Sequence, residues 1–158
     1  FRVLAADLPG YGASARPPEP YTAESLADIL MVGLKRILGS ERFHIGGFSL
    51  GGILGGPIAA TLGPQVRSLI LIGPNGMGLP FPPMPALRRP EPGMSEAEQV
   101  EIVRGNLELL MLADPASADD LAVHVQRENA RLSRISSAGI PAGDALLRAL
   151  PHLSLIHI

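Results

Sequence analysis

The chain has 158 residues, 46% of them hydrophobic, which suits one domain of ordinary size with a core of its own. Its 13 basic and 15 acidic residues leave a net charge of −2, and no basic stripe indicates nucleic-acid binding. It has no cysteine, which excludes disulfides and thiolate metal sites. No apolar run reaches the roughly 20 residues of a membrane span. No signal peptide is visible, so we expect a cytoplasmic protein. We expect neither a metal nor a cofactor.

The first half of the sequence alternates short apolar runs with amphipathic stretches. We expect strands at residues 1–6, 42–48 and 66–72. One helix is predicted between Thr22, a good N-cap, and Gly39, which suits a helix end, because leucine and isoleucine recur at helical spacing between them. A second helix is predicted over residues 50–62, closed by Gly63 and Pro64. This alternation is typical of an α/β fold with a parallel sheet and crossover helices.

The second half of the sequence begins with an irregular stretch from Gly73 to Gly93 that holds seven prolines. Three helices are expected after it, beginning at Ser95 (which forms a capping box with Glu98), at Asp114 and at Asp144. The composition therefore divides the chain into an α/β part, residues 1–73, and an all-helical part, residues 74–152.

Both ends of the chain look unlike the ends of a domain. Residues 153–158, Leu-Ser-Leu-Ile-His-Ile, are similar to the translation of a transposon mosaic end used as a sequencing adaptor, so we leave them out of the fold reasoning. The first residue is phenylalanine, and it opens an apolar, strand-like run. We expect the chain to be an internal piece of a longer protein.

The pattern that indicates chemistry is Gly47-Phe48-Ser49-Leu50-Gly51, which fits G-x-S-x-G between a predicted strand and a predicted helix. A serine on so sharp a turn projects its hydroxyl above the sheet and strains its own backbone. Gly47 and Gly51 lack the Cβ atoms that would collide across the turn. Ser49 would then stand at a helix N-terminus, where free N–H groups favour a developing oxyanion.

Three segments in the same order resemble the α/β-hydrolase fold family. Residues 7–14, Asp-Leu-Pro-Gly-Tyr-Gly-Ala-Ser, are similar to the family's D-x-x-G-x-G-x-S turn, residues 44–52 to its nucleophile elbow, and residues 69–74 to the strand that follows. The resemblance implies a partial α/β-hydrolase core in residues 1–73 and a helical lid or cap in residues 74–152. Within the turn, Asp7 is expected to make local ordering hydrogen bonds.

The resemblance also implies roles for single residues. Ser49 would be the nucleophile of a serine hydrolase, and the backbone N–H of Leu50 would help to bind the oxyanion. The family's catalytic acid and histidine would lie beyond residue 152, because none of His44, His124 and His152 matches the family histidine. The chain alone is expected to be inactive, since serine without a base is a weak nucleophile.

A small-molecule substrate is expected, and its class stays open. Residues 71–78 are similar to a segment of hydrolases that cleave a C–C bond of diketo acids, and Arg127 falls where that group binds the substrate carboxylate. A solvated helix face explains Arg127 as well. Phe48 stands where that group usually has asparagine, and it fits a hydrolase of small carboxylic esters equally well. The alternative is a non-catalytic ligand-binding or sensor protein on the same fold.

Overall fold

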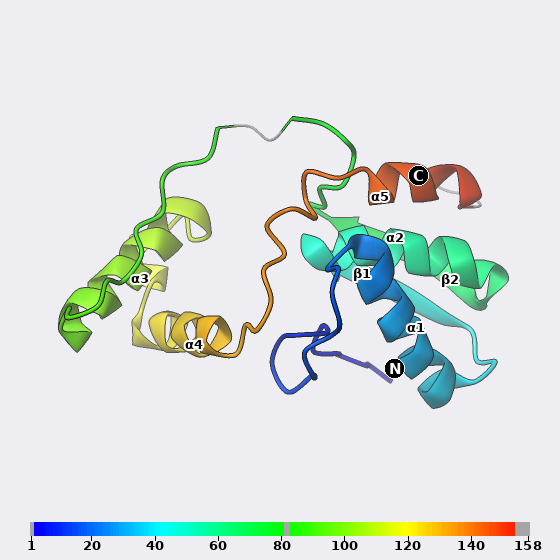
Figure 1. The fold of residues 1–158 in the computed structure, drawn as a ribbon, viewed down its shortest axis with the longest axis horizontal. Coiled ribbons are helices and arrows are strands. Elements are labelled where there is room, and N and C mark those ends of the chain that lie inside the picture. Colours follow the sequence, from blue (N-terminus) through cyan, green and yellow to red (C-terminus); the bar gives the residue numbers. More distant parts are fainter. Residues whose placement is uncertain (1, 81–82, 154–158) are drawn as a thin grey trace. The chain divides into compact units, whose positions relative to one another are not determined.

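The computed structural model describes residues 2–80 and 83–153, which form two compact units (Figure 1). One unit comprises residues 2–80 and 134–153, and the other comprises residues 83–133. The expected helical part, 74–152, therefore contributes to both units. Residues 154–158, which make up most of the adaptor-like tail, lie outside the described residues. Within the described ranges, no helix has the length and hydropathy that a membrane crossing requires.

Among the described residues the sheet has two parallel strands, β1 (Phe43–Phe48) and β2 (Val66–Ile72), which are two of the three expected from the sequence. They pair in one register from His44–Ser68 to Phe48–Ile72, with an irregularity between Phe43 and His44. Burial alternates along both strands, so one face of the sheet is covered and the other is open. The open face carries Phe48, Ile70 and Ile72, which are 63%, 56% and 56% exposed.

The strand expected at residues 1–6 is wrong for its described part, because residues 2–6 form neither strand nor helix. A strand persists only where a neighbouring strand supplies partners for its backbone N–H and C=O groups. Among the described residues no strand pairs with residues 2–6, and Val3 and Leu4 are exposed. The apolar run has the composition of a strand but lacks the neighbour that a strand requires.

The helix α1 (Ala23–Leu38) begins and ends where the sequence predicts. The Thr22 hydroxyl accepts the Ser25 N–H at 3.1 Å, and the Ser25 hydroxyl accepts the Thr22 N–H at 3.0 Å, so the two residues form a capping box. At the other end Gly39 has φ 55° and donates its N–H to the Lys35 carbonyl. The cap and the glycine define both ends of α1 locally.

The helix α2 (Leu50–Leu62) contacts α1, the two strands and the short helix α5 (Ala145–Ala149). A 3₁₀ turn, Gly63–Gln65, follows α2, and another, Leu150–His152, follows α5. A helix without charge that packs on several sides is expected to be buried, as α2 is. A Cβ at Gly55 would lie 3.2 Å from Leu69 of the sheet, and a Cβ at Gly56 would lie 2.6 Å from Leu146 of α5. Glycine therefore permits the close approach of α2 to both neighbours.

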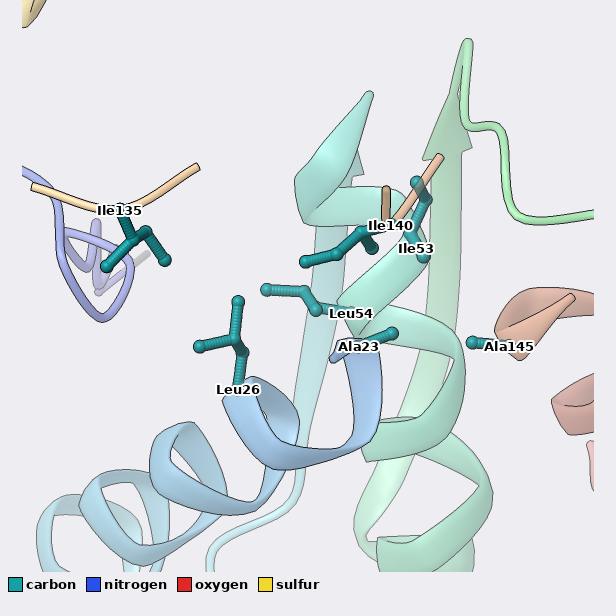
Figure 2. Packing of buried hydrophobic residues seen from close by; sticks show 7 residues of the cluster. All are labelled: Ala23, Leu26, Ile53, Leu54, Ile135, Ile140 and Ala145. Atoms are coloured by element: carbon teal, nitrogen blue, oxygen red, sulfur yellow. The ribbon is translucent and has the colours of Figure 1, made fainter. Parts of the chain in front are cut away.

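One core cluster joins α1, α2 and the chain after residue 134 (Figure 2). Its buried members are Ala23, Leu26, Ile53, Leu54, Ile135, Ile140 and Ala145. In Figure 2 Leu26 projects from α1 and Leu54 from α2, and both belong to this cluster. Full burial of each leucine or isoleucine contributes about 1.5–3 kcal/mol. The residues after the helical unit are thus part of the core on which the sheet and α2 depend.

The turn at residues 7–14 is ordered by Asp7, as the sequence predicts. The Asp7 carboxylate accepts the Ala13 N–H at 2.8 Å, and the Asp7 carbonyl accepts the Ser14 hydroxyl at 2.7 Å. The same carboxylate fills the space beside Gly12, where a Cβ would lie 2.3 Å from it. The turn therefore has no room for a side chain at residue 12.

The chain that follows the helical unit holds the same turn through a set of contacts that we call the Arg134 clamp. The Arg134 N–H donates to the Gly10 carbonyl at 2.8 Å. Its guanidinium donates to the Gly12 carbonyl at 2.8 Å and also to the Ser14 carbonyl. Ile135 packs against Gly10, where a Cβ would lie only 2.7 Å from the isoleucine side chain. The clamp links residues that are at least 120 positions apart in the sequence.

The other unit holds α3 (Glu96–Leu110) and α4 (Asp120–Arg131). The predicted capping box is confirmed, since the Ser95 N–H donates to the Glu98 carboxylate at 2.7 Å. The helix expected from Asp114 is wrong: only a 3₁₀ turn, Pro115–Ser117, begins there. The Asp119 carboxylate accepts the Ala122 N–H at 2.9 Å, so a second N-cap begins α4 five residues later.

Candidate active site

Ser49 lies between the end of β1 and the start of α2, with φ 50° and ψ −117°. Among the described residues it is the one non-glycine residue with positive φ. Such a conformation costs on the order of 1–3 kcal/mol and persists only where the surrounding structure enforces it. The strain predicted from the G-x-S-x-G pattern is therefore present at the serine itself.

Three backbone hydrogen bonds hold the Ser49 turn. The Ser49 N–H donates to the Ile72 carbonyl at the end of β2, at 3.0 Å. The Ser49 carbonyl accepts the N–H groups of Gly52 and Ile53 at 3.0 and 3.2 Å. Among the described residues, the half-buried Ser49 hydroxyl caps no backbone N–H of α2. The backbone is fixed while the hydroxyl keeps its capacity for another partner.

Gly47 is required by the shape of this turn. A Cβ at Gly47 would lie 2.5 Å from the Gly51 carbonyl oxygen and 2.6 Å from the Gly52 nitrogen, closer than real Cβ atoms approach. A Cβ at Gly51 would meet no atom within 4 Å. The clash expected for a Cβ at either glycine therefore occurs at Gly47 and not at Gly51, whose backbone is what a Cβ at Gly47 would strike.

Leu50 is the first residue of α2, so its N–H has no partner inside the helix. The first turn of α2 contains no acidic side chain to offset the positive end of the helix dipole. An oxyanion that forms beside Ser49 would meet both the N–H and the dipole. This arrangement suits the role expected for Leu50.

None of the three described histidines, His44, His124 and His152, forms a hydrogen bond with Ser49. His44 lies on β1 and shares a hydrogen bond between its Nδ1 and the Ser68 Oγ at 2.7 Å. His124 is exposed on α4, in the other unit, and His152 ends the 3₁₀ turn after α5. No hydrogen bond of the described residues joins the Ser49 hydroxyl to a histidine or a carboxylate.

The two candidate substrate contacts belong to different units. Phe48 ends β1 directly before Ser49, and its side chain is largely exposed on the open face of the sheet. Arg127 lies on α4 and donates from its guanidinium to the Glu96 carboxylate at 3.1 Å. Phe48 is therefore a neighbour of Ser49 along the chain, whereas Arg127 is part of the helical unit.

Two features near the site were not found from the sequence. Gly52 brings α2 against the end of the sheet, since a Cβ there would lie 2.9 Å from Pro74 Cβ. The pair Gly51-Gly52 was a signal for this close approach. The Arg134 clamp had no local signal, because its partners are far apart in the sequence.

Comparison with known proteins places this strand, turn and helix in a family. A family model described as alpha/beta hydrolase fold matches residues 1–110. The crystal structure of wild-type Cfl2 from Burkholderia cenocepacia aligns with a TM-score of 0.57 and 26% identity, over 92% of this chain and 53% of that one. A malate-bound thermophilic esterase from Thermogutta terrifontis aligns with a TM-score of 0.46 and 20% identity, over 94% of this chain and 52% of that one.

A curated relative gives a partial match. The dihydrolipoyllysine-residue acetyltransferase component of the acetoin cleaving system of Pseudomonas putida is 34% identical over 77 residues, which are 49% of this chain and 20% of that protein. The match thus spans a fifth of this relative, and the chain covers about half the length of the two solved structures described above. Since the family model covers well over half of its residues, the chain belongs to the alpha/beta hydrolase fold family.

Proposed function

We propose that the chain is part of a serine hydrolase that cleaves small carboxylic esters, with Ser49 as its nucleophile. The observation that carries the proposal is the conformation of Ser49. A positive φ at a non-glycine residue, held by hydrogen bonds from both sides, is backbone strain kept at one residue. A serine that only connects a strand to a helix does not need this conformation.

The chemistry follows from the groups around Ser49. Its Oγ attacks the ester carbonyl carbon while a histidine takes the hydroxyl proton, and the carbonyl oxygen becomes an oxyanion beside the Leu50 N–H. Collapse of this intermediate expels the alcohol, which receives the proton from the histidine. Water then attacks the acyl-enzyme by the same route, releases the carboxylic acid and restores Ser49.

The histidine and the acid are proposed to lie outside residues 1–152. Among the described residues no histidine bonds to Ser49, and the solved structure of Cfl2 is about twice as long as the stretch it shares with this chain. A chain with these residues alone is expected to keep the nucleophile without its base. Its rate of ester hydrolysis should therefore be close to that of a Ser49→Ala variant.

The substrate is proposed to be small and apolar around the ester. Phe48, exposed directly before Ser49, offers an aromatic surface in place of a polar contact. A diketo acid cleaved at a C–C bond is the other substrate class, and Arg127 is proposed to bind the carboxylate of such a substrate.

The test uses the longer protein encoded around this sequence, assayed with p-nitrophenyl butyrate and with an aromatic meta-cleavage product. Ester hydrolysis should fall about 10³-fold or more in Ser49→Ala. It should stay unchanged in Ser68→Ala, a matched control on β2 whose hydroxyl bonds to His44. If the protein cleaves only the diketo acid, the proposed substrate is a diketo acid and not an ester. Binding without turnover of either compound would favour a sensor protein and refute the enzyme proposal.

A further inference from the structure

The helix α1 carries apolar side chains on its exposed surface. Ile29, Val32 and Ile37 are 40%, 61% and 61% exposed. Side chains three and four positions apart are neighbours on a helix, so these residues and Gly33 form one continuous surface, which we call the α1 patch. The buried residues of α1 are others, namely Ala23, Leu26, Ala27, Met31 and Leu38. The α1 patch is therefore an apolar surface that the core of its own chain does not use.

Gly33 lies in the middle of the α1 patch and leaves free space beside the helix. A glycine inside a helix costs about 0.5–1 kcal/mol relative to alanine. At Gly55 and Gly56 of α2, Leu69 and Leu146 leave no room for a larger residue, whereas a Cβ at Gly33 would meet no described atom within 4 Å. Packed helices lie about 8–10 Å apart, and small facing residues permit the shorter distances. Gly33 thus suits the close approach of a helix from another molecule.

The charged side chains of α1 are sorted by sign along the helix. Glu24 and Asp28 lie in its first half, and Lys35 and Arg36 lie in its second half. Glu24 pairs with Arg148, but within the described ranges no ion pair includes Asp28, Lys35 or Arg36. A second helix of the same sequence would place like charges together if it were parallel, and unlike charges together if it were antiparallel. The charge pattern therefore favours an antiparallel copy of α1.

We propose that the α1 patch binds a second copy of this chain, with the two α1 helices antiparallel and Gly33 at their crossing point. Ile29 and Ile37 are each four residues from Gly33, so Ile29 of one copy lies opposite Ile37 of the other. Asp28 of one copy and Arg36 of the other are offset by two residues, about 3 Å along the helix axis, which an arginine side chain spans. The α1 patch is thus complementary to itself, as a two-fold dimer requires.

The dimer is expected to be reversible. One pair of helices buries less than the roughly 1,200–2,000 Å² of a standard interface, so association should occur at micromolar concentrations. Dimerisation through α1 needs no catalytic residue, so it is separate from the proposed hydrolase activity.

The first test is a disulfide between two copies of the chain of residues 1–158. The chain has no cysteine, so Gly33→Cys places one thiol beside the proposed two-fold axis. A disulfide joins Cα atoms about 4.4–6.8 Å apart, a separation that two closely packed helices reach at their crossing point. Gly105→Cys is the matched control, because Gly105 also lies inside a helix, α3, and its Cβ would also meet no described atom within 4 Å. Under mild oxidation Gly33→Cys should cross-link at least about tenfold faster than Gly105→Cys.

The second test reverses charges and measures the dimer by sedimentation equilibrium. Asp28→Lys should weaken dimerisation about tenfold, because each lost ion pair occurs twice in a two-fold dimer. The double variant Asp28→Lys with Arg36→Asp should restore it to within about threefold, since unlike charges again face each other. Glu108→Lys, the same change at an exposed residue of α3, should leave dimerisation unchanged. Far-UV circular dichroism of each variant checks that the helices remain folded.

Four results would overturn the proposal. They are equal cross-linking of the two cysteine variants, a monomer at every micromolar concentration, and a double variant as weak as Asp28→Lys. The fourth is binding to phosphatidylglycerol vesicles without a dimer, which would assign the α1 patch to a lipid surface. Self-association that is as strong in Asp28→Lys as in the wild type would place the contact elsewhere, for example on the open face of the sheet, and would also overturn it.

Discussion

Replacement of Gly47 by alanine is expected to destabilise the chain strongly, because the new methyl group has no space. It would lie 2.5 Å from the Gly51 carbonyl oxygen, whereas real Cβ atoms essentially never come within 3.0 Å of a neighbour. The obstructing atoms are backbone of the first turn of α2, so no side-chain rotation relieves the clash. Overpacking typically costs about 1–3 kcal/mol, and a clash with backbone belongs at the upper end.

The matched control is Gly51→Ala, on the other side of Ser49. Its methyl group would meet no atom within 4 Å, and alanine in a helix is favoured over glycine by about 0.5–1 kcal/mol. The two variants should therefore differ by about 3.5–4 kcal/mol in the free energy of unfolding, measured in urea by far-UV circular dichroism at unchanged m-value. Equal midpoints, or a larger loss in Gly51→Ala, would refute the steric account of this turn.

Three further predictions concern other parts of the chain. Hydrogen bonds from the Ser95 hydroxyl and then its N–H lower the pKa of Glu98. These hydrogen bonds to the ionised Glu98 therefore stabilise α3 fully above the ordinary pKa of a glutamate, about 4.3. The stabilisation is lost as the pH falls through the lower pKa that Glu98 has in the folded chain. The protection factors of the amides at the start of α3, from hydrogen exchange corrected for its intrinsic pH dependence, should fall in that acid range, but should stay constant in Glu98→Gln, whose side chain does not titrate. In Arg134→Gln, limited proteolysis should cleave the turn at residues 7–14 several-fold faster than in the wild type, because the Arg134 clamp is lost. A cleavage rate equal to that of the wild type would contradict the stabilising role of the clamp. Ile70→Lys, on the open face of the sheet, should reduce self-association in analytical ultracentrifugation, whereas the exposed Leu121→Lys on α4 should not.

The elements found from the sequence are those whose signals lie within a few residues. The boundaries of α1 follow from the Thr22 cap and from Gly39, and the start of α3 follows from the Ser95 capping box. The Ser49 turn was predictable for the same reason, because its pattern fits into five residues between a strand and a helix. Local caps and turns fix local backbone, and no distant contact is needed to detect them.

The features missed or mistaken depend on distant or competing partners. Residues 2–6 have the composition of a strand, but a strand needs a neighbour that a local pattern does not reveal. Asp114 and Asp119 both cap backbone N–H groups, and the sequence alone does not say which begins the longer helix. The hollow between α3 and α4, lined by Val103, Leu107 and Arg127 among others, depends on how the two helices pack, which the periodicity within each helix does not determine.

The two junctions of the helical unit have a consequence for how such proteins diversify. The Gly78 N–H donates to the Gly143 carbonyl at 2.9 Å, and the Arg134 N–H donates to the Gly10 carbonyl at 2.8 Å. Both hydrogen bonds join residues of the unit that holds the sheet. Because they join backbone groups, they survive the substitution of most side chains. Evolution can therefore replace the stretch between them as a cassette, with new helices and a new cleft, while the Ser49 turn is inherited unaltered.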